Sequence, residues 1–307
     1  MFLKKEGYCE NQHPMVDYLN AHYEYCYLES MHYINSIQET TTIITGLSYG
    51  LDGLESNLMN GKVLNFSMHS QDLYYDFMHI KRAVLNSQKR ITQCIITLGY
   101  YSFFYDLSCS SNKWKCLGTY IPLFSDGHHA EFARSSADEA WCNNKEFIRF
   151  YHSFFEETGS FYGAAISREH TVLGVTQKGG WLSLNASERD YEAYQLAQKH
   201  NNHILHKETY NENIEIFYNM ISFLIEHNIR PIVTVLPSSK EYLRYIDPTY
   251  KEILMSDLEL LPYCIDFIDM NEIDLFTDED ILDSDHLNYF GAIKASVLMD
   301  GVINNII

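Results

Sequence analysis

A serine near one end of the chain and an aspartate–histidine group near the other have the residue types of a hydrolytic triad. Ser48 is the central residue of a G-x-S-x-G pentapeptide, and His286 follows Asp283 by three positions. A serine on a tight strand-to-helix turn exposes its hydroxyl, and small neighbours let a substrate carbonyl approach. A carboxylate that accepts the imidazole Nδ1–H leaves Nε2 free to take the serine proton. The spacing predicts Ser48 as nucleophile, His286 as general base and Asp283 as orienting carboxylate, with Asp285 as the alternative for that last role.

Each segment also has an ordinary explanation when it is taken alone. Glycine and serine are common in turns. The acidic residues 278–280 favour a solvated loop around His286. The two segments support each other, because loops that follow parallel strands gather at one edge of a doubly wound sheet. Residues 48 and 286 can then meet although they lie far apart in the sequence.

Short apolar runs alternate with amphipathic segments along most of the chain. Runs rich in β-branched residues that end at glycine or proline are typical of buried strands. Strands that alternate with helices predict a parallel sheet covered on both faces. The fold class is therefore α/β, a doubly wound, flavodoxin-like five-stranded parallel sheet. Strands are predicted at residues 41–45, 62–66, 91–98, 229–236 and 263–268, and helices at 15–38, 70–87, 214–225 and 288–305.

Residues 107–205 interrupt this alternation between the third and fourth strands. The segment is far longer than one crossover needs and contains all three tryptophans. We predict a single domain, 1–307, in which 107–205 is an insertion that caps the active-site edge and contributes a side chain such as Trp181 or His170 to the cleft.

The α/β-hydrolase fold also uses G-x-S-x-G and the chain order Ser, Asp, His. Its nucleophile turn, however, follows several earlier strands. The 47 residues before Ser48 are mostly one predicted helix, so they leave no room for those strands.

With these motifs the chain resembles the SGNH (GDSL-like) hydrolases, especially bacterial members associated with modification of cell-surface polysaccharide and teichoic acid. The resemblance implies the SGNH hydrolase fold and acyl transfer through an acyl-serine intermediate. It also implies an ester, of acetyl or a similar group, on a carbohydrate or glycan. The ester would be either hydrolysed or formed by transfer from an acyl donor such as acetyl-CoA, without a cofactor. The matching blocks are residues 46–48, 63–67 with 71–76, 98–103, Pro237 and 283–286.

The chain departs from this family at two positions. Ser67 stands where members usually have glycine, and Tyr101 stands where they usually have the asparagine that donates to the oxyanion. The resemblance then implies an oxyanion hole formed by the N–H groups of Ser48 and Ser67 and by Tyr101. Loss of one such donor lowers an acyl-transfer rate on the order of a hundredfold. The alternative hypothesis is a non-catalytic protein that keeps the fold and binds a ligand.

Two further side chains are candidates for substrate binding. Tyr100 follows the third strand and His69 follows the second, so both are expected near the active-site edge. The alternatives are an aromatic rim of the core for Tyr100 and a polar loop position for His69. His128 and His129, beside Asp126 and Glu131, suggest a metal site, but no spaced third ligand accompanies them and a surface loop is favoured. We predict no metal.

Composition excludes some classes of partner. The 22 basic and 41 acidic residues give a net charge of −19, which repels phosphate backbones and argues against nucleic acid. No run approaches the length of a membrane span. The seven cysteines are odd in number and scattered, as is usual in a reducing compartment, so we expect a cytoplasmic protein.

Overall fold

The structure is a computed structural model that describes residues 39–88, 90–113 and 180–305, together with positions 37, 115, 116, 120, 124 and 126–130. The chain divides into two compact units, Met1–His32 with Leu107–Ile166, and Tyr33–Asp106 with Ser167–Ile307. The second unit holds the sheet and every residue of the predicted triad. The predicted helix at 15–38 lies outside the described residues except for position 37. Trp114, Trp141 and His170 also lie outside them.

The sheet has five strands, all parallel, in the order β2-β1-β3-β4-β5. This is the flavodoxin-like order of a doubly wound sheet, so the predicted fold class is confirmed. The strands are β1 (Thr42–Gly46), β2 (Val63–Asn65), β3 (Gln93–Leu98), β4 (Arg230–Val235) and β5 (Asp266–Asp269).

Strand burial follows from composition. All five residues of β1 are buried, in keeping with a Thr-Ile-Ile-Thr-Gly sequence that is covered on both faces. Within the described part of the chain, β5 pairs with β4 alone, and its residues are partly buried. The strand predicted from residue 263 begins at Asp266, because pairing with β4 starts at Ile232 opposite Asp266.

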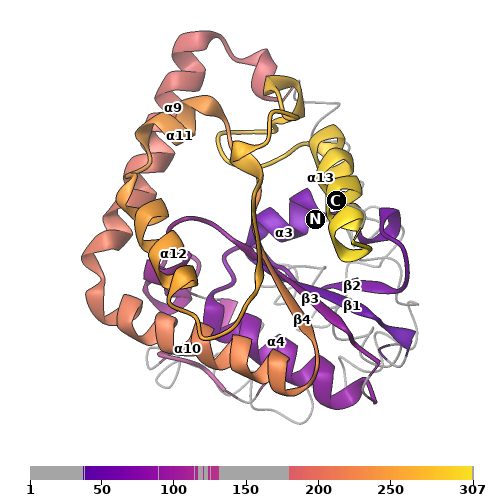
Figure 1. Ribbon diagram of the computed structural model, residues 1–307. Helices are drawn as coiled ribbons and strands as arrows, with labels where there is room; N and C mark the ends of the chain where they lie inside the picture. The colour runs from indigo at the N-terminus through magenta and orange to yellow at the C-terminus, as the bar shows by residue number, and fades with distance from the viewer. Residues whose placement is uncertain are drawn as a thin grey trace, which may run out of the picture. The chain divides into compact units, whose positions relative to one another are not determined.

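Helices cover both faces of the sheet. α4 packs against α10, and α3 packs against α13. Figure 1 shows these two pairs on opposite sides of the strands. The helices are α3 (Ser48–Gly53), α4 (Leu73–Asn86), α9 (Ala186–Asn201), α10 (Lys207–Glu226), α11 (Lys240–Tyr245), α12 (Thr249–Glu259) and α13 (Tyr289–Ile303).

The described end of the predicted insertion is ordered around α9. A capping box between Asn185 and Glu188 starts this helix, and the helix packs along α11 (Figure 1). Just before α9, the 3-10 turn η7 (Trp181–Ser183) contacts η10 (Asp278–Asp280), and Trp181 is fully buried. The structure therefore places η7 beside the segment that leads into the Asp283–His286 loop.

Within the described residues, no helix has the length and apolar character needed to cross a membrane.

Candidate active site

The turn that carries Ser48 depends on its two glycines. Gly46 ends β1 with φ of 143°, a conformation that L side chains rarely adopt. A Cβ at Gly46 would lie 2.2 Å from the carbonyl oxygen of Thr97, and a Cβ at Gly50 would lie 2.4 Å from Ser67 Oγ. Ser48 is the first residue of α3. The glycines thus let β1 and α3 approach their neighbours closely and bring Ser48 to the carboxyl edge of the sheet.

The histidine loop is held by side chains of its own sequence. Asp283 Oδ1 accepts the backbone N–H groups of Asp285 and His286 at 3.0 and 2.9 Å. Asn288 caps α13 by accepting the N–H groups of Phe290 and Gly291 at 2.9 and 3.1 Å. These bonds fix the loop directly before α13 and aim the imidazole at α3.

Ser48, His286 and Asp283 form a continuous hydrogen-bonded chain. Ser48 Oγ lies 2.7 Å from His286 Nε2. On the other side of the ring, Nδ1 lies 3.0 Å from Asp283 Oδ1 and 3.1 Å from Oδ2. With the proton on Nδ1, the imidazole donates to Asp283 and Nε2 can accept the serine proton. The three predicted residues are therefore brought together with the distances that nucleophilic catalysis requires.

Asp285 contacts the same ring nitrogen from a buried position. Its Oδ1 is 3.0 Å from His286 Nδ1, and its Oδ2 accepts a hydrogen bond of 2.6 Å from the Tyr49 hydroxyl. The Tyr49 hydroxyl is also 3.3 Å from that of Tyr101. The Asp285 side chain is 4% exposed, whereas that of Asp283 is 48% exposed.

The charges at this site shift several pKa values. Burial alone would lower the pKa of His286, but the Asp285 and Asp283 carboxylates outweigh it and raise that pKa well above its ordinary value. Burial likewise would raise the pKa of Asp285, but the neighbouring His286 and the Tyr49 hydrogen bond hold it below its usual range. Burial and the charge of Asp285 raise the pKa of Tyr49, so its hydroxyl keeps its proton and donates.

Two of the three predicted oxyanion donors already have partners. The Ser67 N–H donates to Asn65 Oδ1 at 2.9 Å. The Tyr101 hydroxyl lies against that of Tyr49, and the Tyr101 ring stacks on His200 of α9 with centroids 4.1 Å apart. An oxyanion would have to replace these contacts of Ser67 and Tyr101. Of the three predicted donors, the backbone N–H of Ser48 is therefore the one best able to bind an oxyanion without such a rearrangement.

The two predicted substrate-binding residues differ in their surroundings. Tyr100 is buried, and its hydroxyl donates to Asp269 Oδ2 at 2.7 Å and accepts from Asn271 at 3.2 Å. His69 is half exposed, with Nδ1 3.7 Å from Asp52 Oδ2. Tyr100 therefore fits the alternative of a core rim better than a substrate platform, and the His69 ring has the greater access to solvent.

Sequence reasoning did not identify Tyr49 or His200 as members of this network. Tyr49 follows the nucleophile directly, so its place inside the G-x-S-x-G motif was a usable signal. His200 lies on a polar helix 86 residues before His286, and nothing in its local sequence indicates that its ring stacks on Tyr101.

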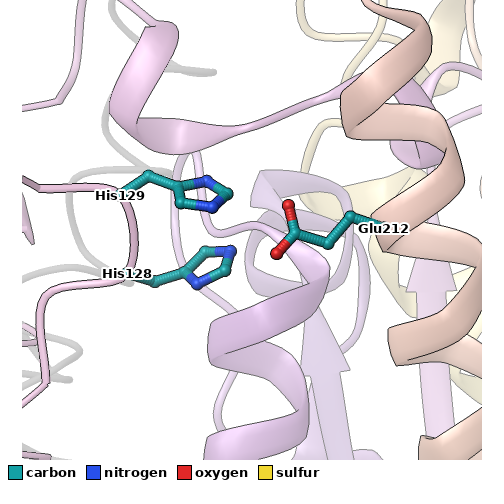
Figure 2. A group of neighbouring side chains, drawn as sticks. All are labelled: His128, His129 and Glu212. Atoms are coloured by element: carbon teal, nitrogen blue, oxygen red, sulfur yellow. The ribbon is translucent and has the colours of Figure 1, made fainter.

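Among the residues that the structure describes, two groups of side chains have the composition of metal ligands. The rings of His128 and His129 stack with centroids 3.9 Å apart (Figure 2). Glu212, also drawn there, belongs to the other unit, and we assign no site across the two. In the second group, Asp283, Asp285 and His286 offer ligand atoms within 4.8 Å of one another. A cation on Nδ1 of His286 would take the place of the proton that the triad geometry requires.

Comparison with known proteins gives little further information. No family model matches the chain, and no curated protein matches it. Among solved structures, the chain is similar to a "putative platelet activating factor" from Streptococcus pneumonia, with a TM-score of 0.43 and 9% identity. The match covers 95% of this chain and 96% of that one. Similarity at this level does not indicate a function.

Proposed function

We propose that this chain is a serine-dependent ester hydrolase or O-acyltransferase of the SGNH (GDSL-like) type. The observation that carries the proposal is the 2.7 Å contact between Ser48 Oγ and His286 Nε2, on a ring whose Nδ1 lies against Asp283. The position of the serine immediately after β1 of a doubly wound sheet supports it.

The reaction proceeds by two acyl transfers. Ser48 Oγ attacks the ester carbonyl while its proton passes to His286 Nε2, and the Ser48 N–H stabilises the oxyanion, joined by Ser67 and Tyr101 once their present contacts are replaced. Collapse of the tetrahedral intermediate breaks the ester bond, and His286 gives the proton to the leaving alcohol, or to the leaving thiol when the donor is a thioester such as acetyl-CoA. Water or an acceptor alcohol then attacks the acyl-serine, His286 takes its proton, and Ser48 is released with its proton restored.

The substrate belongs to the same proposal. The family resemblance supports an acetyl or similar ester on a carbohydrate or glycan and an acyl donor such as acetyl-CoA in the transfer mode. The odd number and scattered positions of the cysteines support a cytoplasmic setting. His69 is the better placed of the two predicted substrate contacts, because its side chain is 45% exposed.

A specific observation favours a second function, that of a non-catalytic binding protein. The Ser67 N–H is bonded to Asn65, and the Tyr101 hydroxyl faces Tyr49. A protein whose oxyanion donors stay engaged would bind an ester without cleaving it.

Labelling with a fluorophosphonate probe separates the two functions, because the probe reacts with an activated serine. We expect one label per chain, located at Ser48 by peptide mapping, and no label in Ser48→Ala. Ser256→Ala, an exposed serine on α12, is the matched control and should label like the wild type. Absence of label, or a label on another serine, would reject the enzyme. Turnover of p-nitrophenyl acetate that survives chelator treatment would also exclude a cation at His286.

A further inference from the structure

Asp285 supplies a buried charge that the triad of Ser48, His286 and Asp283 does not use. Its Oδ1 lies as close to His286 Nδ1 as Asp283 Oδ1 does, at 3.0 Å. Nδ1 carries one proton, so two carboxylates at the same distance cannot both serve as full hydrogen-bond acceptors. The two aspartates therefore need different roles.

The surroundings of the two carboxylates separate these roles. Asp283 makes a hydrogen bond with Nδ1 and accepts two backbone N–H groups of its own loop, and its side chain is half exposed. Water screens the charge of such a group. Asp285 is buried, and the field of a buried charge is screened much less. Asp283 is thus suited to fix the loop and the ring direction, and Asp285 is suited to act through its charge.

Groups from three helices and from the residue before η3 surround this buried charge. Tyr49 of α3 donates to Asp285 Oδ2, and Tyr101, just before η3 (Ser102–Phe104), lies against the Tyr49 hydroxyl. The His200 ring of α9 stacks on Tyr101, and its Nδ1 forms a hydrogen bond of 2.7 Å with the Tyr242 hydroxyl of α11. Burial lowers the pKa of His200 to about 4, so His200 is neutral near pH 7. His286 is therefore the cation that Asp285 pairs with when the ring is protonated.

We infer that Asp285 is a positioning residue whose buried charge, held by the Tyr49 hydroxyl, stabilises the His286 imidazolium formed at each acyl-transfer step. Asp283 fixes the loop and the tautomer. The inference deepens the proposed function and rests on it. It assigns to Asp285 the larger electrostatic share of a role that the sequence pattern gives to Asp283.

The pH dependence follows from this assignment. His286 accepts the serine proton only when the ring is neutral, so the rate rises as pH passes upward through its pKa. A negative charge beside the ring raises that pKa. Asp285→Asn removes the buried charge and should move the acid limb of the kcat/KM profile to lower pH, while lowering the plateau because the imidazolium loses its partner. Asp283→Asn should move the limb less, since the charge it removes is screened.

The test measures the titration of His286 directly as well as the rate. Side-chain NMR of 13C-labelled histidine, with the His286 signal assigned by its loss in His286→Gln, gives the pKa without any substrate. We expect a wild-type value above 6.5, the ordinary value for histidine. In Asp285→Asn we expect the pKa of His286 to fall by at least about one unit, which is a tenfold weaker proton affinity. The pKa of His286 should fall by less in Asp283→Asn. It should not change in Asp274→Asn, which removes an exposed carboxylate.

Two results would overturn the assignment. One is a pKa of His286 at or below 6.5 in the wild-type protein, a measurement that does not depend on the folding of any variant. The other is a shift in Asp283→Asn that equals or exceeds the shift in Asp285→Asn. The NMR readout also separates this inference from the proposed function: the expected shifts in a protein whose Ser48 never labels would reject the hydrolase and leave the pairing of Asp285 with His286 in place.

Discussion

Ser48 contributes its hydroxyl to the site and little to the packing around it. The residue is partly exposed at the first position of α3, and its one described side-chain bond is to His286. Ser48 is thus held in place by the backbone geometry of the turn between β1 and α3 more than by its own side chain.

Ser48→Ala should therefore abolish probe labelling and ester turnover and change the free energy of unfolding by no more than about 0.5 kcal/mol, as for other substitutions away from the core. Urea denaturation beside the activity assay checks both parts. A variant that unfolds at much lower urea would show that the hydroxyl has a structural role and would leave its loss of activity open to that explanation.

Tyr49 is a contrasting residue, because its hydroxyl holds a buried charge. Removing the donor of a hydrogen bond to a buried ionised group costs on the order of 1.5–3 kcal/mol. Tyr49→Phe should lose stability of that order in urea denaturation, while Tyr191→Phe, on the exposed face of α9, should lose almost none. Equal losses in the two variants would contradict the Tyr49–Asp285 bond.

At the scale of elements, α4 braces the turn that carries Ser48 through the buried side chain of Asp76. Asp76 Oδ1 accepts from Thr45 Oγ1 at 2.6 Å and from Gln71 Nε2 at 2.7 Å. Gln71 also donates to the carbonyl oxygens of Gly46 and Phe66 at 3.3 and 3.1 Å. The ends of β1 and β2 are thereby tied to the start of α4, directly beneath the turn that carries Ser48.

Asp76 should also make stability depend on pH. Burial raises the pKa of Asp76 to about 7, against 3.8 for the ordinary group. The folded chain therefore holds a proton that the unfolded chain releases, so this stabilisation is complete below about pH 4 and is lost as pH rises toward 7. The difference in unfolding free energy between wild type and Asp76→Asn should decline over that window and level off above it. Denaturation at a series of pH values measures this difference in unfolding free energy, with Asp274→Asn as control. A difference between wild type and Asp76→Asn that is independent of pH would contradict the raised pKa of Asp76.

The elements themselves were largely predictable, because hydrophobic periodicity and β-branched runs depend on local sequence. The predicted strands at 41–45, 62–66, 91–98 and 229–236 each overlap a strand of the structure, and the parallel pairing followed from the α/β alternation. The order of the strands came with the flavodoxin-like fold class and not from the alternation alone. The start of β5 was not predictable from composition, since pairing with β4 determines it. The difference in burial between Asp283 and Asp285 was not predictable either, because it depends on α3, α9 and α11, which are distant in the sequence.

At the scale of the whole molecule, the net charge of −19 sets how charged substrates approach. A strongly acidic protein repels anions, and salt weakens that repulsion as the screening length falls from about 30 Å at 0.01 M to about 3 Å at 1 M. If the donor is anionic, as acetyl-CoA is, kcat/KM should rise with salt. For neutral p-nitrophenyl acetate it should stay nearly constant. Equal salt dependence for the two donors would show that the overall charge does not act on substrate entry.

The division into two units bears on the predicted insertion. Residues 107–166 are grouped in one unit and 167–205 in the other. Within the sheet-bearing unit, η7 contacts η10 and α9 packs along α11. That 107–205 as a whole caps the active-site edge in one domain stays a prediction.

The strand order has a consequence for when activity first appears. Ser48 follows β1, whereas His286 follows β5, at the far edge of the sheet and 238 residues later. A nascent chain therefore completes the turn that carries Ser48 long before the ribosome has released the segment that carries His286. If these two residues act as proposed, the Ser48 hydroxyl is an ordinary alcohol until β5 has paired with β4 and α13 has docked. Reactivity at Ser48 would then report that the sheet has closed on its last strand, and newly made chains would not be acylated at Ser48 while they are still emerging.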